Sequence, residues 1–185
     1  IITTTGFSTV DFDKWPEFSK GLLVVLMFIG ACAGSTGGGI KVSRIIILFK
    51  SMAKELSVMI HPKQVRKITV DSHAIDHETV RSVNVYMVCY IMVFVISMGV
   101  MSFDNYDLIT NFTAVAATLN NVGPGLEMVG PIQNFGFMSS PTKLILIFDM
   151  LAGRLELFPM LLFFSPATWI QSGFARKKKR TRKFS

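Results

Sequence analysis

Two short uncharged stretches contain the residue types that bind a dehydrated cation: TTGFS at residues 4–8 and NVGPG at 121–125. A cation leaving water needs oxygen ligands, and backbone carbonyls supply them only where successive C=O groups turn the same way. Such a backbone needs unusual dihedral angles, which glycine tolerates. The two stretches therefore predict a site where carbonyl oxygens replace a hydration shell. Two ordinary extracellular turns are the alternative.

The composition indicates a chain that is solvated largely by lipid. Of the 185 residues, 50% are hydrophobic and 17% are charged, whereas a soluble domain carries about 25% charge. The mean hydropathy is +0.48. This composition excludes disorder, collagen, a coiled coil and a disulfide scaffold. The net charge of +7 is compatible with binding to nucleic acid, but the positions of the basic residues argue against it.

Two apolar runs predict membrane helices. Residues 82–103 contain 22 positions without a charge, which is about 33 Å of helix and enough for a hydrocarbon core of ~30 Å. Residues 21–40 are also uncharged, but five glycines fall within 30–39. Each glycine costs a helix interior about 1 kcal/mol relative to alanine. We therefore expect a helix, a break and a second helix over 20–57.

The rest of the chain completes a repeated unit. Residues 107–119 are amphipathic but, at about 20 Å of helix, too short to cross a membrane. A glycine-containing return over 120–140 follows, and then an apolar span over 143–170. Residues 1–10 resemble that return, so the chain holds one complete unit and the rear of another. The predicted parts are a filter loop and broken helix (1–57), a cytoplasmic connector (58–80), a complete repeat (81–170) and a basic tail (171–185).

Basic residues predict the orientation. Residues 41–81 hold eight Lys or Arg and residues 171–185 hold seven, whereas 104–142 hold none. Cytoplasmic loops carry the excess of Lys and Arg. We therefore expect the connector and the C-terminus in the cytoplasm, the two returns opening outside, and no binding of nucleic acid. The tail is also expected to contact anionic membrane lipid.

Four motifs in order carry a family resemblance: TTTGFST before a Trp-Pro pair, ACAGSTGGGIKV, ATLNNVGPG and MLAGRLELF. Together they closely resemble TrkH/TrkG-type potassium uptake proteins of the Trk/Ktr/HKT superfamily, over nearly the whole chain up to about residue 170. The resemblance implies an all-α membrane protein of four repeats, each a membrane helix, a pore half-helix, a filter loop and a second helix. Here one and a half repeats are present, the end of the third and all of the fourth.

The resemblance also assigns site residues. Gly6 and Gly123 match the filter glycines, one of which is serine in relatives that pass Na⁺, so two intact glycines favour K⁺. The potassium ligands are expected from Thr5, Gly6, Val122 and Gly123. The filter set as a whole is Thr4, Thr5, Gly6, Phe7, Asn121, Val122 and Gly123.

The glycine-rich break corresponds to the intramembrane loop that gates relatives below the filter. Its residues are Gly34, Ser35, Thr36, Gly37, Gly38 and Gly39. Non-helical backbone at membrane depth must line a cavity, although close helix packing by small residues is an alternative. The G-x-x-x-x-G spacing of Gly34 and Gly39 also fits a phosphate loop, but Ile40 stands where that motif needs lysine.

Arg154 lies inside the last apolar span, where a charge costs at least ~2.5 kcal/mol. Asp149 and Glu156 share one helix face, and Arg154 is about 140° from the first and about 200° from the second at ~100° per residue. We therefore expect Arg154 to point toward the pore, and the resemblance gives it the role of a positive barrier beneath the filter. An ion pair with another helix is the alternative.

The sequence thus predicts K⁺ transport, with no cofactor and no enzyme chemistry, since it has no Ser-His-Asp, Cys-His or paired-acid arrangement. The resemblance implies a multi-pass protein of the bacterial inner membrane. It also implies a homodimer bound to a cytosolic nucleotide-binding regulatory subunit (TrkA-like). Alternatives are a truncated, non-conducting fragment with a scaffold role and a nucleotide-binding membrane enzyme. Channel-like transport and coupling to H⁺ or Na⁺ both remain open.

Overall fold

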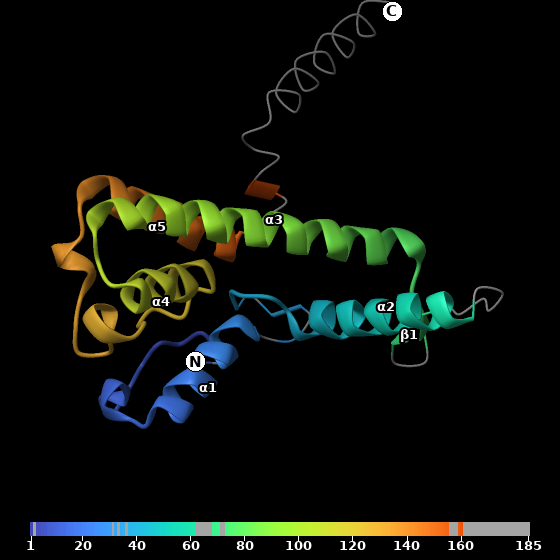
Figure 1. Cartoon of the computed structure of the whole chain (residues 1–185), viewed down its shortest axis with the longest axis horizontal. Helices are drawn as coiled ribbons and strands as arrows, with labels where there is room; N and C mark the ends of the chain where they lie inside the picture. Colours follow the sequence, from blue (N-terminus) through green and yellow to red (C-terminus); the bar gives the residue numbers. More distant parts are fainter. Residues whose placement is uncertain are drawn as a thin grey trace, which may run out of the picture.

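The protein is described by a computed structural model (Figure 1). The structure describes residues 1, 3–30, 32, 34–35, 37–61, 68–70, 73–155 and 159–160. Within them the chain is helical, and the described strands are β1 (Thr69–Val70) and β2 (His73–Ala74), which pair antiparallel. The predicted all-α fold class is confirmed.

Five α-helices lie within the described residues, and they follow the predicted order. They are α1 (Glu17–Phe28), α2 (Val42–Ile60), α3 (His77–Met101), α4 (Leu108–Leu119) and α5 (Ser140–Arg154). Figure 1 shows α4 between α1 on one side and α3 with α5 on the other, and α4 contacts all three helices. Short 3₁₀ turns lie in the connections: η1 (Phe12–Lys14), η2 (Ser102–Asp104), η3 (Glu127–Val129) and η4 (Phe135–Phe137).

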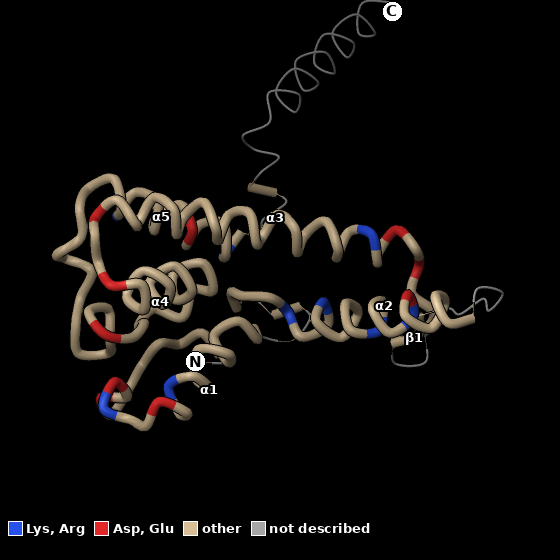
Figure 2. The backbone as a smooth tube through the Cα atoms, viewed as in Figure 1, with Lys and Arg blue, Asp and Glu red and all other residues tan. Residues whose placement is uncertain are grey.

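Helix α3 is the predicted membrane span over 82–103. Together with η2 it forms a helical segment of 28 residues, within which an 18-residue stretch has a mean hydropathy of 2.1, so it is long and apolar enough to cross a membrane. Side chains such as Val88, Met92 and Val95 remain exposed along it, as expected for a surface that faces lipid or another part of a larger protein. Its charged residues lie toward the two ends (Figure 2).

Helix α4 is the predicted half-helix, and it forms the centre of the fold. Nine of its twelve residues are buried, which is unusual for so short a helix. Asp107 accepts a hydrogen bond from the amide of Ile109 at 3.1 Å and so caps its first turn. Small residues, including Ala114, Ala116 and Ala117, allow the neighbouring helices to approach its backbone.

The glycine-rich segment separates α1 from α2, as predicted from its composition. Helix α2 then packs along the half of α3 that is remote from α4 (Figure 1). There the Arg44 guanidinium lies 4.1 Å from the centre of the Tyr86 ring, a favourable cation–π arrangement. Basic residues are distributed along α2, whereas acidic ones gather in the loops at the α4 end (Figure 2).

Helix α5 covers the first part of the apolar span predicted over 143–170. Helix α5 starts at Ser140 and ends at Arg154, and Leu155 adopts φ −83° and ψ 2°. Pro159 disfavours an uninterrupted helix at this point, because proline lacks an amide donor and its ring clashes with the carbonyl four residues earlier, that of Leu155. The remainder of the predicted span and the basic tail lie outside the described residues, apart from 159–160.

Asp104 joins the end of α3 to the start of α5. Its Oδ2 atom accepts hydrogen bonds from the Thr142 hydroxyl at 2.6 Å, the Ser139 hydroxyl at 2.7 Å and the Ser139 amide at 3.3 Å. A carboxylate at a helix N-terminus satisfies amides that have no intrahelical partner. This contact holds α3 and α5 side by side around α4.

Candidate cation filter and gate

The two predicted filter stretches lie against one another although they are far apart in sequence. A Cβ atom added to Gly6 would overlap the carbonyl oxygen of Val122, and one added to Gly123 would lie 4.0 Å from the Cα of Gly6. Only glycine at position 6 permits this approach of the two backbones. The structure therefore brings Gly6, Val122 and Gly123 together.

Both stretches also share one backbone pattern. The φ angle is positive at Thr4 (51°) and Gly6 (74°), and again at Asn121 (54°) and Gly123 (109°). Left-handed residues at every second position turn successive carbonyls to one side of the chain and successive amides to the other. The sequence predicted this freedom for the glycines. Asparagine adopts positive φ more readily than most residues, whereas Thr4 gave no such signal.

Hydrogen bonds show where the amides of the second stretch point. Asn121 donates its amide to the carbonyl of Thr118 at 3.0 Å, and Val122 donates to Ala117 at 2.8 Å. These acceptors belong to the last turn of α4, whose carbonyls have no intrahelical partner. Within the described chain, no backbone amide donates to the carbonyls of residues 121–123. These oxygens are therefore free to act as ligands.

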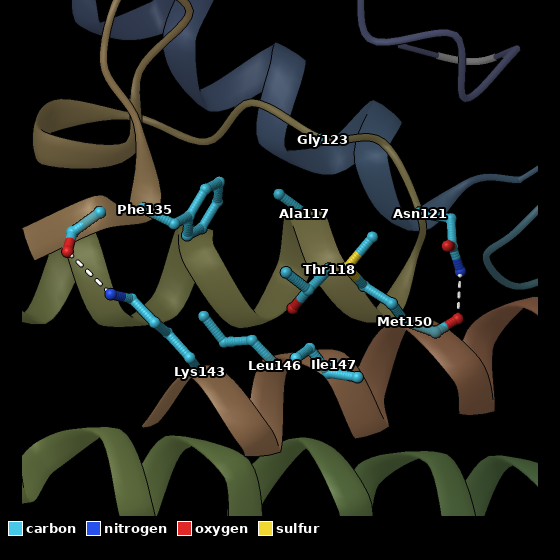
Figure 3. A pocket seen from close by; sticks show the side chains of 10 residues that line it. Ala117, Thr118, Asn121, Gly123, Phe135, Lys143, Leu146, Ile147 and Met150 are labelled. Carbon is cyan, nitrogen blue, oxygen red and sulfur yellow. Dashed lines mark hydrogen bonds between the residues drawn. The ribbon is translucent and has the colours of Figure 1, made fainter. Parts of the chain in front are cut away.

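Two asparagines attach the end of α4 to the surrounding helices. Asn120 is fully buried, and its Oδ1 atom accepts from the Tyr90 hydroxyl of α3 at 2.8 Å. Asn121 donates from Nδ2 to the carbonyl of Met150 in α5 at 3.0 Å (Figure 3). Sequence reasoning missed Tyr90 and Asn120, because nothing in the sequence pairs a tyrosine with an asparagine 30 positions away.

Of the other predicted filter residues in the first stretch, Thr5 and Phe7 are exposed, whereas Thr4 is half-buried. The hydroxyls of Thr3 and Thr5 lie 2.8 Å apart, and the Phe7 side chain is 94% exposed. A phenylalanine so uncovered is costly in water, which agrees with a segment that is covered in a larger protein. The described chain contains nothing that packs over Phe7.

The glycine loop starts and ends at a narrow neck. Ile29 and Ile40 form a parallel bridge, and the Gly30 amide donates to the carbonyl of Ile40 at 2.9 Å. At the neck, a Cβ added to Gly38 would overlap the carbonyl oxygen of Asn120. The loop thus lies directly against the residue that leads from α4 into the second filter stretch.

Within the loop, Gly34 and Gly39 have positive φ angles of 84° and 81°. Gly34 has open space around it, and Ser35 accepts a hydrogen bond from the Gly37 amide at 3.2 Å. The break predicted from composition is confirmed, whereas its role as a gate stays a prediction. Thr36 lies outside the described residues.

Arg154 is exposed at the last position of α5. The residue before it, Gly153, lies against the end of α4, where an added Cβ would overlap the carbonyl oxygen of Leu119. Arg154 therefore follows directly after the contact between α5 and the pore half-helix. Its guanidinium makes no hydrogen bond or ion pair with another described residue, and Glu156 lies outside the described residues.

Asp149, by contrast, is fully buried between α5 and α3. Its Oδ1 atom accepts from the Ser97 hydroxyl at 2.8 Å, while its Oδ2 atom has no partner in the described part of the chain. Arg154 does not pair with it. This agrees with the expectation that the two side chains point to different sides of α5, whereas the direction of Arg154 toward a pore stays a prediction.

A cavity of about 450 Å³ lies between α4, α5 and the loops beside them (Figure 3). Apolar side chains such as Leu146, Ile147 and Met150 form much of its wall, and Gly123 borders it. At its outer end the Lys143 ammonium donates to the carbonyl of Gly136 at 2.8 Å. The second filter stretch thus has the pore half-helix on one side and an apolar hollow on the other.

A helix that can span a membrane, a buried half-helix and a glycine-containing return are the elements expected of an α-helical membrane protein built from pore repeats. Comparison with known proteins gives the family: residues 2–171 match TrkH, described as a cation transport protein. The chain belongs to the TrkH family.

Similar proteins include the Trk system potassium uptake protein TrkH of Salmonella typhimurium LT2, with 43% identity over 90% of this chain and 34% of the relative. TrkG of Escherichia coli K12 is 32% identical over 91% of the chain and 34% of the relative. The crystal structure of the potassium transporter TrkH from Vibrio parahaemolyticus matches with a TM-score of 0.81 and 44% identity, over 90% of this chain and 35% of that one. The chain spans about a third of the length of these relatives.

Proposed function

We propose that this chain supplies two filter loops and a gate to the pore of a Trk-type potassium uptake protein. The observation that carries the proposal is the contact of Gly6 with Val122, in two stretches that share the same alternation of positive φ angles. The names of the relatives, which are potassium uptake proteins, supply the ion.

In this mechanism K⁺ exchanges its water for the carbonyl oxygens of Thr5, Gly6, Val122 and Gly123. The amides of 121 and 122 are engaged by the end of α4, so the carbonyls are held in place without a charged side chain. The partial negative charge at the C-terminus of α4 also favours a cation there. Neutral ligands let the ion bind and then leave, which conduction requires.

Below the filter the ion passes the loop of residues 34–39, including Thr36, and the guanidinium of Arg154. The loop lies against Asn120, so a change in its conformation alters the passage directly beneath the second filter stretch. Arg154 adds a positive charge that raises the barrier for a cation. The two features together constitute the proposed gate.

The same proposal places the protein in the bacterial inner membrane, with α2 and the C-terminus on the cytoplasmic side. Basic residues on α2 and acidic residues in the opposite loops support this orientation (Figure 2). As the resemblance implies, the protein assembles as a homodimer with a TrkA-like nucleotide-binding subunit. The basic segment 41–81 is the contact face proposed for it.

The chain spans a third of its relatives, so the test uses a chimera. Residues 1–170 replace the matching part of the Vibrio parahaemolyticus TrkH, and the chimera is expressed in a strain that lacks potassium uptake. We expect growth at low K⁺, and loss of that growth with Gly6→Asp at equal membrane abundance.

A chimera that reaches the membrane and does not restore growth contradicts the proposed function. The chain alone, expressed in the same strain, tests the alternative of a non-conducting fragment: growth rescue by the chain alone would exclude that alternative.

A further inference from the structure

Asp13 connects two loops that are 114 positions apart. Its Oδ1 atom accepts a hydrogen bond from the amide of Glu127 at 3.0 Å. Its Oδ2 atom occupies the space beside Gly130, where an added Cβ would overlap it. Both carboxylate oxygens therefore face the backbone of one turn, that of residues 127–130.

On its own side Asp13 is well fixed. It lies in η1 next to Phe12, whose side chain is 5% exposed, and its amide donates to Oδ1 of Asp11 at 3.3 Å. Six residues separate it from Gly6. We expect a shift of the segment that carries Asp13 to displace the first filter stretch as well, because the two are close along the chain.

The turn that Asp13 contacts is equally fixed to the pore half-helix. The amide of Leu126 donates to the Thr113 hydroxyl at 3.1 Å, and the amide of Gly125 donates to the carbonyl of Val129 at 2.7 Å. A Cβ at Gly125 would lie 2.7 Å from the Cγ2 atom of Val129. Because the turn is compact and anchored on α4, its position sets that of Gly123.

The loops that carry the two filter stretches are thus joined at two places: within the stretches at Gly6 with Val122, and beyond them at Asp13 with Glu127 and Gly130. We infer that Asp13 is a positioning residue that fixes the distance between the third and fourth filter loops and so the ion selectivity of the pore. This inference rests on the proposed function. A hydrogen bond to a charged acceptor is among the strong ones, and it suits a contact that must resist displacement.

The test uses four variants of the chimera. Asp13→Ala removes the acceptor, whereas Asp13→Asn keeps an oxygen for the Glu127 amide. Gly130→Ala disturbs the contact from the other side. Glu17→Gln, on a side chain that is 89% exposed, removes an acidic charge without touching the contact and serves as the control.

We expect Asp13→Ala and Gly130→Ala each to lower K⁺ over Na⁺ selectivity in a flux assay about tenfold, the effect of losing one charge-assisted hydrogen bond. The double variant should be no worse than either single one, since both remove the same contact. Asp13→Asn and Glu17→Gln should keep most of the selectivity. An equal loss with Asp13→Asn and Glu17→Gln would show instead that the charge attracts cations, and would overturn the inference.

Hydrogen exchange in detergent separates this inference from the proposed function. Peptides covering residues 125–130 should exchange faster in Asp13→Ala than in the parent chimera. If these peptides exchange at the same rate in Asp13→Ala as in the parent, the contact of Asp13 with residues 127–130 is overturned, whatever the transport result. If the parent chimera is selective and Asp13→Ala exchanges faster but keeps that selectivity, the positioning role is overturned. If the parent chimera itself does not discriminate K⁺ from Na⁺, the proposed function is contradicted.

Discussion

The carbonyl oxygen of Val122 occupies the space that a side chain at Gly6 would need. Gly123 differs, because the nearest atom to its added Cβ is the Cα of Gly6 at 4.0 Å, although its φ of 109° is strained for any other residue. The backbone conformation thus favours glycine at both positions, since the φ of Gly6 is 74°, whereas the close approach requires glycine at position 6 alone.

This difference predicts unequal effects of substitution in the chimera. Gly6→Ala forces the two loops apart and should abolish selective uptake. Gly123→Ser has room for its side chain and bears strain of about 1–3 kcal/mol, so uptake should persist with lower K⁺ over Na⁺ selectivity. Flux assays with both ions check this, and full selectivity in Gly123→Ser would contradict the filter assignment.

The contact of Gly153 with α4 predicts a packing effect in the same chimera. Gly153→Ala places a methyl group on the carbonyl oxygen of Leu119 and should lower stability by about 1–3 kcal/mol. Gly99→Ala in α3 is the matched control, because an added Cβ there meets nothing within 4 Å. It should be neutral or stabilising by up to about 1 kcal/mol.

Thermal unfolding in detergent measures both variants. Equal melting temperatures for Gly153→Ala and Gly99→Ala would contradict the close approach of α5 to the end of the pore half-helix.

The hydrogen bond from Tyr90 to the buried Asn120 predicts a further loss of stability. Tyr90→Phe leaves Oδ1 of Asn120 without this partner, at a cost of about 1–3 kcal/mol. Tyr106→Phe is the comparison, since its hydroxyl donates to the carbonyl of Phe137 at an exposed position. The melting temperature should fall further for Tyr90→Phe, and the opposite ranking would argue against the role of Asn120 as an anchor of the filter.

The proposed role of Arg154 as a positive barrier predicts that its removal changes the rate of K⁺ flux. Arg154→Ala removes a positive charge from the proposed gate and should raise K⁺ flux, while Arg154→Lys keeps the charge and should stay near the parent. Flux is compared at equal protein in proteoliposomes. Equal or lower flux in a folded Arg154→Ala variant would favour an ion pair with another helix.

The sequence predicted the elements whose signals are local. An uncharged run identified α3, the length of residues 107–119 identified a half-helix, and glycine density identified the break between α1 and α2. These predictions depend on helix length, membrane thickness and backbone entropy, which are properties of a segment by itself.

What the sequence did not reveal depends mainly on residues that are distant along the chain. The end of α5 at Arg154 lies inside an apolar run, where only Pro159 interrupts the helical pattern. The bond between Tyr90 and Asn120, and that between Asp13 and Glu127, require a tertiary arrangement that no spacing encodes. The close approach of Gly153 to Leu119 also could not be predicted, because a lone glycine in a helix does not identify the residue that packs against it.

The most direct test of the filter is a crystal structure of the chimera grown with Rb⁺, a K⁺ analogue that scatters anomalously. We predict an anomalous peak within coordination distance of the carbonyl oxygens of Gly6 and Val122. A well-ordered filter with no peak beside these two residues, or a peak held only by acidic side chains of the outer loops, would contradict the account.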